Sequence, residues 1–395
     1  MFLSKIVRFA SLSMLLLANT SCHTQPLPVL SGKITMSPGW KPVVYLIQPR
    51  NFSEVAANYS GIMVDSCAIA TDGSFAFSKM PGNTIKGLFQ VCVQQPGSRY
   101  PTLLLDDNPL NSNYMPVVLQ NGGVVEINAE SNRFQASFSI QRPSAENAAL
   151  LQLRDIRHAA FQQHLAGHTE APDENNLLEH EAALLRFREP MMAFADSTSR
   201  FWPALVAVRW VSPEADYERV PEFLIRQCKK WEGQTQDNPW PQQLCAAANP
   251  EKLPVQTGSG IPDFPMPMAA GDTTALYALL GERLTIVDIW ASWCAPCRRE
   301  NRDVLVPLYR EYKGKGLQII GYSIDSSRDA WKSAIAKDAT GWPHASHLLG
   351  DATPFMEALH VTTIPANFIV DNRGKIIAKN LHGEALKAFI VHYYQ

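Results

Sequence analysis

Two cysteines separated by two residues are the side chains of this sequence best suited to chemistry. Cys294 and Cys297 enclose Ala295 and Pro296. They follow the apolar run 284–290, which is rich in β-branched residues, as a strand buried on both faces is. Apolar residues recur at helical spacing after them. We therefore expect the two cysteines to lie where a buried strand ends and a helix begins.

A helix N-terminus would make Cys294 a reactive thiol. Unpaired backbone N–H groups and the positive end of the helix dipole favour a thiolate at that position. Cys297 lies one helical turn further on, close enough to attack a mixed disulfide formed at Cys294. Pro296 suits the first helical turn because no N–H donor is needed there. The spacing predicts that Cys294 is the nucleophile and Cys297 the resolving thiol.

Other uses of a cysteine pair fit this sequence less well. A zinc half-site would need two more ligands, and the candidates, His344 and His347, lie far outside the usual zinc-finger separation. Haem attachment would need a histidine directly after the second cysteine, where Arg298 stands. A structural disulfide across so short a loop would remove little entropy from the unfolded chain. We expect no metal and no bound cofactor, because the Cys294–Cys297 disulfide itself carries the electrons.

A second motif completes a resemblance to a known family. The dithiol, with Trp293 before it and Pro296 within it as supporting residues, is followed by Thr-Thr-Ile-Pro-Ala-Asn-Phe-Ile-Val-Asp at 362–371. Together these motifs resemble the thioredoxin superfamily, and in particular the membrane-tethered thiol-disulfide oxidoreductases of the TlpA/ResA type. The resemblance covers residues 261–395. It implies an α/β thioredoxin-like C-terminal domain of the AhpC/TSA-thioredoxin kind.

The same resemblance implies roles for single residues. Pro365 would be cis and face the dithiol, and Ile364 would offer backbone hydrogen bonds to a bound polypeptide. Glu300 matches an active-site glutamate of the TlpA/ResA type, and Asp288 matches the buried aspartate of thioredoxin itself. A buried carboxylate near Cys297 would accept its proton during resolution. An ordinary solvated helix residue is the alternative for Glu300.

Residues 1–22 have the pattern of a secretory signal. Lys5 and Arg8 precede an apolar stretch, 9–18, that is too short to span a bilayer. Ser21 followed by Cys22 resembles the end of a Bacteroidetes-type lipoprotein signal, in which Cys22 would become the lipidated first residue. A plain signal cleaved elsewhere is the alternative. We expect an exported protein on the periplasmic side, held to a membrane by its lipid anchor.

Length and charge limit the remaining possibilities. The 395 residues are enough for two or three domains. The formal net charge of −2 shows no basic excess, so nucleic acid is not an expected partner.

The β-rich region, residues 27–140, contains short alternating runs separated by turn residues. This pattern predicts an antiparallel β-sandwich-like domain. Asp72 with Gly73, and Asn121 with the glycines at 122–123, predict hairpin turns. The region resembles the β-rich module that often precedes thioredoxin domains in Bacteroidetes lipoproteins. It shows no catalytic constellation, and binding a partner or acting as a spacer is its default role.

The helical region, residues 143–249, follows with apolar residues at helical spacing. Ser144 is the predicted N-cap of the first helix. A second helix should begin near Asp173 and end before Pro190, and a third is expected around 214–231. Residues 250–260 are rich in proline, glycine and polar residues, and they predict a linker into the C-terminal domain, 261–395.

Four further cysteines agree with export. Their even number could form two structural disulfides in an oxidising compartment. The simplest of three pairings joins Cys67 to Cys92 and Cys228 to Cys245. Buried free cysteines that behave as small hydrophobic residues are the alternative.

These patterns together predict a tethered thiol-disulfide oxidoreductase. We expect it to reduce disulfides of exported proteins and to receive electrons from an upstream donor in the membrane. Reduction is the direction that the resemblance implies, although oxidising relatives share the motif. A thiol peroxidase is one alternative, although the threonine-proline pair of peroxiredoxins is absent before Cys294. A non-catalytic lipoprotein that uses the C-terminal domain as a scaffold is another.

Overall fold

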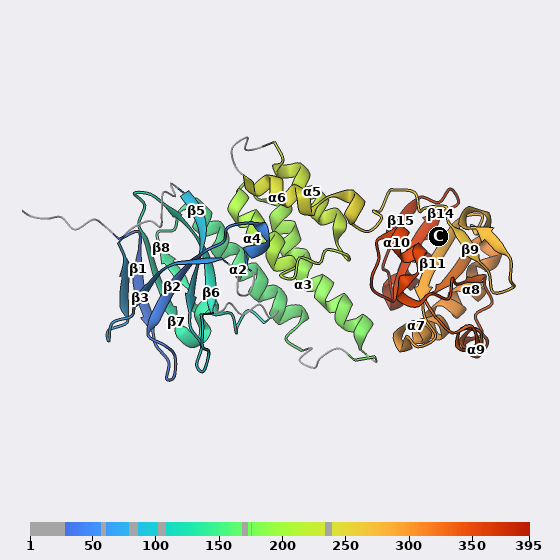
Figure 1. Ribbon diagram of the computed structural model, residues 1–395, viewed down its shortest axis with the longest axis horizontal. Coiled ribbons are helices and arrows are strands. Elements are labelled where there is room, and N and C mark those ends of the chain that lie inside the picture. The colour runs from blue at the N-terminus through green and yellow to red at the C-terminus, as the bar shows by residue number, and fades with distance from the viewer. Residues whose placement is uncertain are drawn as a thin grey trace, which may run out of the picture.

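Three parts of the chain follow one another along the long axis of the molecule (Figure 1). The computed structural model describes residues 28–56, 61–78, 86–101, 108–167, 173–174, 176–233 and 239–395. The predicted signal, 1–22, and its lipidation site Cys22 lie outside these residues. Within the described residues, no helix combines the length and apolar character needed to cross a bilayer.

Two four-stranded sheets form the β-rich region, as far as its residues are described. The first has the order β4 (Ser74–Phe77), β1 (Leu30–Thr35), β7 (Val125–Glu130), β8 (Ser139–Gln141). The second has the order β3 (Ile62–Ala68), β2 (Val43–Gln48), β5 (Lys86–Val93), β6 (Tyr114–Gln120). Strand pairs are antiparallel, as predicted, except that β1 runs parallel to β7. The short turns η1 (Phe52–Glu54), η2 (Ser131–Arg133) and α1 (Phe134–Ser137) complete this region.

The prediction of two hairpins was wrong. The turn at Gly73 joins β3 to β4, and the turn at Gly122 joins β6 to β7, but each strand pair is divided between the two sheets. Both glycines have positive φ, 84° and 75°, so the local turn chemistry was read correctly. A tight turn fixes only the direction of the chain. Which sheet receives the next strand depends on the nonlocal partners that bury its apolar face.

Five helices form the part of the helical region that the structure describes. They are α2 (Ala145–His164), α3 (Leu177–Ser197), α4 (Phe201–Val211), α5 (Pro221–Trp231) and α6 (Pro239–Ala247), followed by the turn η3 (Pro250–Lys252). The predicted cap is confirmed, because the Asn147 N–H donates to Ser144 Oγ at 3.3 Å. Helix α4 was not predicted, because its residues from Pro203 to Val211 are all buried and lack the amphipathic period that marks a surface helix.

The prediction that the second helix ends before Pro190 was also wrong. Helix α3 continues through Pro190 to Ser197. A proline inside a helix removes one backbone hydrogen bond. Met191, Phe194 and Ala195 follow it and are buried, so tertiary packing outweighs this loss.

The β-rich and helical regions share one hydrophobic core, which extends from Val29 to Leu253. Strand β6 is an edge strand, and the Asn147 side chain of α2 pairs with it, accepting from the Val118 N–H and donating to the Val118 carbonyl. The indole of Trp210 in α4 donates to the Tyr114 hydroxyl of the same strand. The helices therefore pack onto the sandwich and protect its open edge.

The C-terminal domain is built on one five-stranded sheet with the order β13 (His344–Ala345), β12 (Leu317–Ser323), β11 (Leu284–Trp290), β14 (Ala366–Asp371), β15 (Ile376–Lys379). Strands β11, β12 and β13 are parallel, and β14 and β15 are antiparallel to their neighbours. A short hairpin, β9 (Pro265–Pro267) and β10 (Thr273–Ala275), precedes the sheet. This architecture confirms the predicted thioredoxin-like α/β fold.

Helices and turns cover this sheet. They are η4 (Leu276–Leu279), α7 (Ala295–Glu300), the π turn η5 (Asn301–Leu305), α8 (Val306–Tyr312), η6 (Lys313–Lys315), α9 (Arg328–Asp338), η7 (Gly350–Ala352), α10 (Pro354–Leu359) and α11 (Gly383–Tyr394). The π turn ends two residues before Pro307, which has no N–H to donate to the preceding turn.

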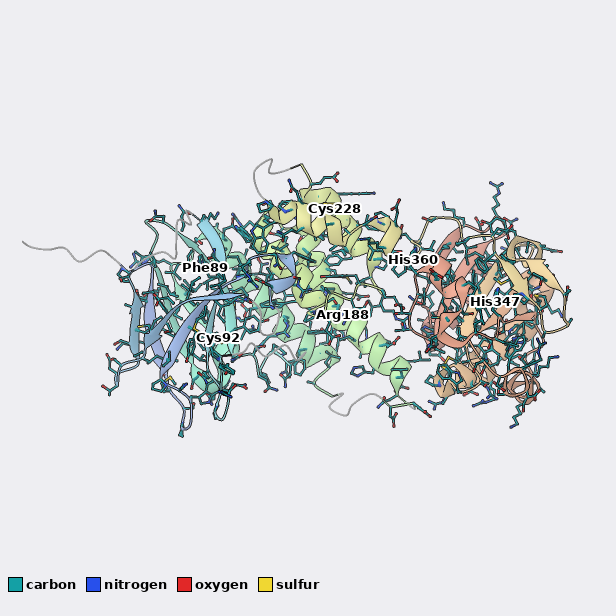
Figure 2. The ribbon with its side chains drawn as sticks, viewed as in Figure 1. Phe89, Cys92, Arg188, Cys228, His347 and His360 are labelled. Carbon is teal, nitrogen blue, oxygen red and sulfur yellow. A yellow bond between two sulfur atoms is a disulfide. The ribbon has the colours of Figure 1, made fainter. Side chains whose placement is uncertain are left out.

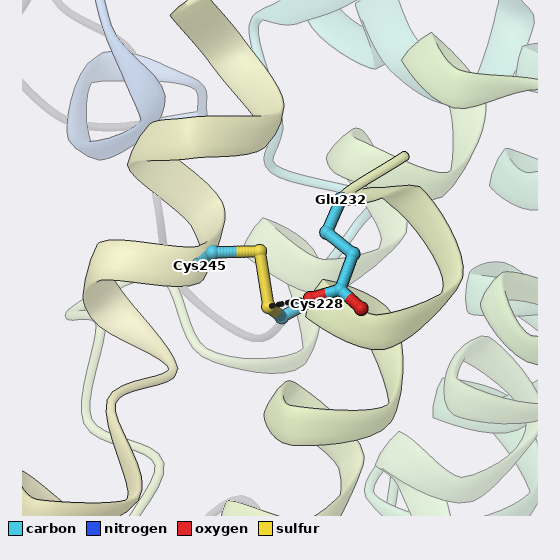
Figure 3. A group of neighbouring side chains, drawn as sticks. All are labelled: Cys228, Glu232 and Cys245. Carbon is cyan, nitrogen blue, oxygen red and sulfur yellow. Dashed lines mark hydrogen bonds between the residues drawn. A yellow bond between two sulfur atoms is a disulfide. The ribbon is translucent and has the colours of Figure 1, made fainter. Parts of the chain in front are cut away.

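One of the two predicted structural disulfides is present. Cys228 of α5 bonds to Cys245 of α6, with a Cα–Cα distance of 4.8 Å (Figure 3). Cys67 and Cys92 are free cysteines, so the prediction that they pair was wrong. Both strands that carry them pair with β2, one on each side, which places the cysteines two strand spacings apart, about 9–10 Å. A disulfide does not span that distance.

The sulfurs at positions 228 and 245 also belong to the one group of potential metal ligands found among the described residues. Glu232 completes it, with ligand atoms within 4.8 Å of one another (Figure 3). Both sulfurs are bonded to each other in this structure, whereas a cysteine binds metal as a thiolate. Figure 2 places Cys228 among the helices and Cys92 within the sandwich, at separate sites.

We predict that replacing both members of the α5–α6 disulfide, C228S with C245S, destabilises the full chain by about 3 kcal/mol. The bond closes a loop across a sequence separation of 17 residues, which restricts the unfolded chain. Urea denaturation of the oxidised protein measures the effect. The matched control is C67S, which removes a free sulfur and closes no loop. Equal losses in the two proteins would contradict this account of the disulfide.

Candidate active site

The dithiol lies where the sequence analysis placed it, between β11 and α7. Cys294 is the N-cap residue of α7, with φ −79° and ψ 96°, and its sulfur accepts a hydrogen bond from the Cys297 N–H at 3.3 Å. Pro296 occupies the first turn. The two sulfurs are joined as a disulfide. The structure therefore represents the oxidised form of the pair.

The two sulfurs differ in how far solvent reaches their residues. Cys294 is 6% exposed and Cys297 is 2% exposed. Trp293, directly before them, is 61% exposed, although it is a large apolar side chain. An incoming thiol or disulfide therefore meets Cys294 first, beside an indole surface that is open to a partner.

Hydrogen bonds from Asp325, which follows β12, and from Arg298 of α7 fix the loop that carries the dithiol. The Asp325 carboxylate accepts from both the N–H and the hydroxyl of Ser292, at 2.8 and 2.6 Å. Arg298 donates to the Ser292 carbonyl at 3.0 Å and forms an ion pair with the buried Asp338. The backbone N–H and carbonyl of Ser292 are thus both bound within the domain, which preorganises the cysteines.

The cis proline expected from the resemblance is confirmed, since the Ile364–Pro365 peptide bond is cis. Residue Ala366, next along the chain, pairs with Ile289 near the end of β11 that leads to the dithiol. Ile364 is half-buried and packs against the apolar cluster that includes both cysteines. The fold therefore brings residues 364–365 to the same end of the sheet as the dithiol, across about 70 residues of sequence.

Two buried carboxyl groups lie on the side of the sheet that α7 covers. Burial raises the pKa of Asp288 well above its usual range, and the nearby Glu300 charge raises it further. Glu300 is only 4% exposed, which excludes the solvated alternative. Its carboxylate is 2.7 Å from His382 Nδ1 and accepts the Gly383 N–H at 3.0 Å. Glu300 thus joins α7 to the start of α11.

His382 is the residue of this site that sequence reasoning missed. It is the N-cap residue of α11, 82 positions after Glu300. Asn367 of β14 orients the same segment, since its amide donates to the Leu381 carbonyl and accepts the Leu381 N–H. No local pattern in the sequence links these positions, because only the fold brings α11 to α7.

The two histidines considered as zinc ligands have other surroundings. His344 lies against the rings of Trp290 and Trp342, and burial lowers its pKa to about 4. A Cβ at Gly321 would come within 2.5 Å of the His344 ring, so only glycine leaves room for it. His347 is 2.6 Å from the Tyr322 hydroxyl. Figure 2 shows His347 within the C-terminal domain.

The sheet order, the dithiol at the start of α7 and the cis proline beside it define a thioredoxin-like domain. Residues 257–379 match the model of the AhpC/TSA family. Over 145 residues the chain is 28% identical to a thiol-disulfide oxidoreductase ResA of Bacillus cereus, and the match covers 37% of this chain and 80% of that relative.

Other relatives have similar names. The thiol:disulfide interchange protein DsbE of Pseudomonas fluorescens biotype C is 27% identical over 129 residues, 32% of this chain and 68% of that relative. A solved thiol-disulfide oxidoreductase from Bacteroides fragilis NCTC 9343 aligns at 30% identity over 34% of this chain and 98% of that chain, with a TM-score of 0.32. The C-terminal domain thus has a thioredoxin-like fold and is similar to relatives named thiol-disulfide oxidoreductases and interchange proteins.

We predict that Asp288→Asn stabilises the oxidised protein, and that the gain grows as the pH rises. Above the pKa of the unfolded chain, about 3.9, unfolding releases a proton that the folded Asp288 retains, so the native protein loses stability. Asparagine does not titrate, so the variant avoids this loss. The loss amounts to at most about 1.4 kcal/mol in the free energy of unfolding per pH unit, up to the pKa of Asp288 in the folded protein.

Unfolding by urea between pH 5 and pH 8 measures this gain. The control is Asp329→Asn, which removes an exposed carboxylate from the same domain. A gain for Asp288→Asn that is the same at both pH values would show that the protonation of this residue does not differ between the folded and unfolded chains.

Proposed function

We propose that this protein reduces disulfides in exported proteins by dithiol exchange at Cys294 and Cys297. The observation that carries the proposal is the position of the dithiol, capping α7 beside the cis proline and an exposed Trp293. The names of the relatives agree with exchange chemistry. The direction of electron flow is our inference from the resemblance to the TlpA/ResA type.

The exchange begins with the reduced protein. The Cys294 thiolate attacks one sulfur of the substrate disulfide, that S–S bond breaks, and the other substrate sulfur leaves as a thiolate. Cys297 then loses its proton and attacks Cys294 Sγ, which releases the second substrate sulfur. The substrate gains two electrons, and the chain ends with the Cys294–Cys297 disulfide.

Neighbouring residues support these steps. Asp288 in its ionised form is the proposed acceptor of the Cys297 proton during resolution, because its raised pKa is closer to that of a thiol than the pKa of an ordinary carboxyl group is. Glu300 holds α7 against α11 and adds to the raised pKa of Asp288. Ile364 offers its backbone to the bound polypeptide, and Pro296 supports the first turn of α7.

The cellular setting is part of the proposal. A signal at residues 1–22, with lipidation at Cys22, would export the chain and anchor it to a membrane on the periplasmic side. Each turnover leaves the dithiol oxidised, so an upstream donor in the membrane must return two electrons. No cofactor beyond the dithiol is needed for this cycle, and the charge balance of the chain favours protein substrates over nucleic acid.

We predict that Cys297→Ala traps substrates as mixed disulfides in living cells. The variant retains the attacking thiol but cannot resolve the intermediate, so covalent adducts sensitive to dithiothreitol should accumulate. Non-reducing electrophoresis and mass spectrometry of the purified variant identify them. The matched control lacks both cysteines, C294A with C297A. Adducts of the same pattern in this control would contradict exchange at Cys294.

We also predict a midpoint potential at or below about −250 mV for the Cys294/Cys297 couple, near that of thioredoxin. Alkylation and mass spectrometry across a series of redox buffers measure it in the full chain. A value near about −120 mV, typical of a strong periplasmic oxidant, would reverse the proposed direction and indicate a disulfide donor.

A further inference from the structure

The loop before the cis proline is held by residues of the helical region. This loop, residues 362–365, follows α10 and has no regular secondary structure. His360 ends α10 in the left-handed conformation, and Figure 2 places it on the side of the C-terminal domain that faces the helices. The segment between α4 and α5 approaches the loop from that side (Figure 1).

Glu218 makes the main contact. One carboxylate oxygen accepts the N–H and the hydroxyl of Thr362, at 3.0 and 2.5 Å. The other oxygen accepts the N–H and the hydroxyl of Thr363, at 3.2 and 2.6 Å. All four hydrogen bonds have a carboxylate as the acceptor, and Glu218 itself is only 9% exposed. Bonds of this type are stronger than those between neutral groups.

Arg219 holds the other end of the loop. Its Nη2 donates to the Pro365 carbonyl at 3.2 Å and to Glu181 of α3 at 3.3 Å. Glu181 in turn fixes the guanidinium to the long helix of the region. Consecutive residues 218 and 219 thus bind the backbone on both sides of Ile364.

The helical region also reaches the other element of the site. Arg299 of α7, two residues after Cys297, donates to the Glu174 carbonyl at 3.5 Å. The helical region therefore contacts both the loop 362–365 and the helix α7 that begins at the dithiol. A second contact of the same interface does not involve residues 362–365: Glu222 of α5 binds Lys379 at 2.9 Å and accepts the Thr257 N–H at 2.8 Å.

We propose that Glu218 and Arg219 are positioning residues for the disulfide exchange, and that the helical region uses them to fix the loop that receives the substrate polypeptide. The inference rests on the proposed function, in which Ile364 offers its backbone to the substrate. A loop fixed in advance loses less conformational entropy when a polypeptide binds beside it. Small disulfides make no use of this backbone, so the effect is selective for protein substrates.

The carboxylate at position 218 is the informative group to change. In Glu218→Gln one acceptor oxygen becomes an NH2 group, which cannot accept the backbone N–H of a threonine. The side chain keeps its size, so the packing of the helical region is retained. The loop should lose part of its order, while the dithiol, which Glu218 does not contact, should keep its properties.

The experiment compares two substrates in the full chain: insulin is assayed with dithiothreitol as the reductant, and 5,5′-dithiobis(2-nitrobenzoate) is assayed in single turnovers with the pre-reduced protein alone, because dithiothreitol reduces that compound directly. For insulin, a protein disulfide, we expect Glu218→Gln to lower kcat/KM about tenfold, mainly through a higher KM. For 5,5′-dithiobis(2-nitrobenzoate), a small disulfide, we expect a change of less than twofold. The midpoint potential of the Cys294/Cys297 couple should stay the same, and amide exchange at Thr362 and Thr363 should become faster.

Glu222→Gln is the matched control, because it weakens the same interface without contacting residues 362–365. It should leave both substrates within twofold of the wild type. The proposal is overturned if Glu218→Gln leaves insulin reduction unchanged or increases it, or if Glu222→Gln has the same effect. An altered potential with equal losses for both substrates would likewise overturn it. Failure of the proposed function looks different, since the wild type would then reduce insulin no faster than dithiothreitol alone does.

Discussion

The burial of strand β11 along its whole length is the constraint on which the rest of the site depends. All seven of its residues, Leu284–Trp290, are buried, and the strand is hydrogen-bonded on both sides. A strand in this position cannot shift its register without exposing apolar side chains or breaking two ladders at once. Its end is therefore a fixed point. The dithiol follows that end after a short loop, so the packing of the sheet core determines where the dithiol lies.

The two neighbours of β11 supply the remaining parts of the site. Parallel strand β12 ends beside it and leads to Asp325, which binds the dithiol loop. Antiparallel strand β14 begins beside the same end, directly after the cis proline. The end of parallel strand β12 and the start of antiparallel strand β14 therefore lie at the same edge of the sheet as the end of β11. Segments that are distant in the sequence meet at this edge.

Burial also gives the acidic residues their properties. Asp288 shares the central strand with the apolar core, so the surroundings penalise its charged form and raise its pKa. Glu300 is buried as well, but it is satisfied by His382 and by the start of α11. Two acids on the same side of one sheet therefore differ in role. One keeps its proton more readily, and the other holds two helices together.

The N-terminal regions make contact with this site through polar side chains. The β-rich and helical regions share one apolar core, whereas the contacts that reach the loop before the cis proline come from Glu218 and Arg219. The sequence alone was sufficient for the dithiol, its place at a helix start, the cis proline and the thioredoxin-like fold, because these depend on local spacing and on motifs. Tertiary structure alone decided to which sheet each strand belongs. It also placed Cys67 and Cys92 on opposite sides of β2, and it brought His382 and Glu218 to the site. Such contacts join residues far apart in the chain, and no local periodicity encodes them.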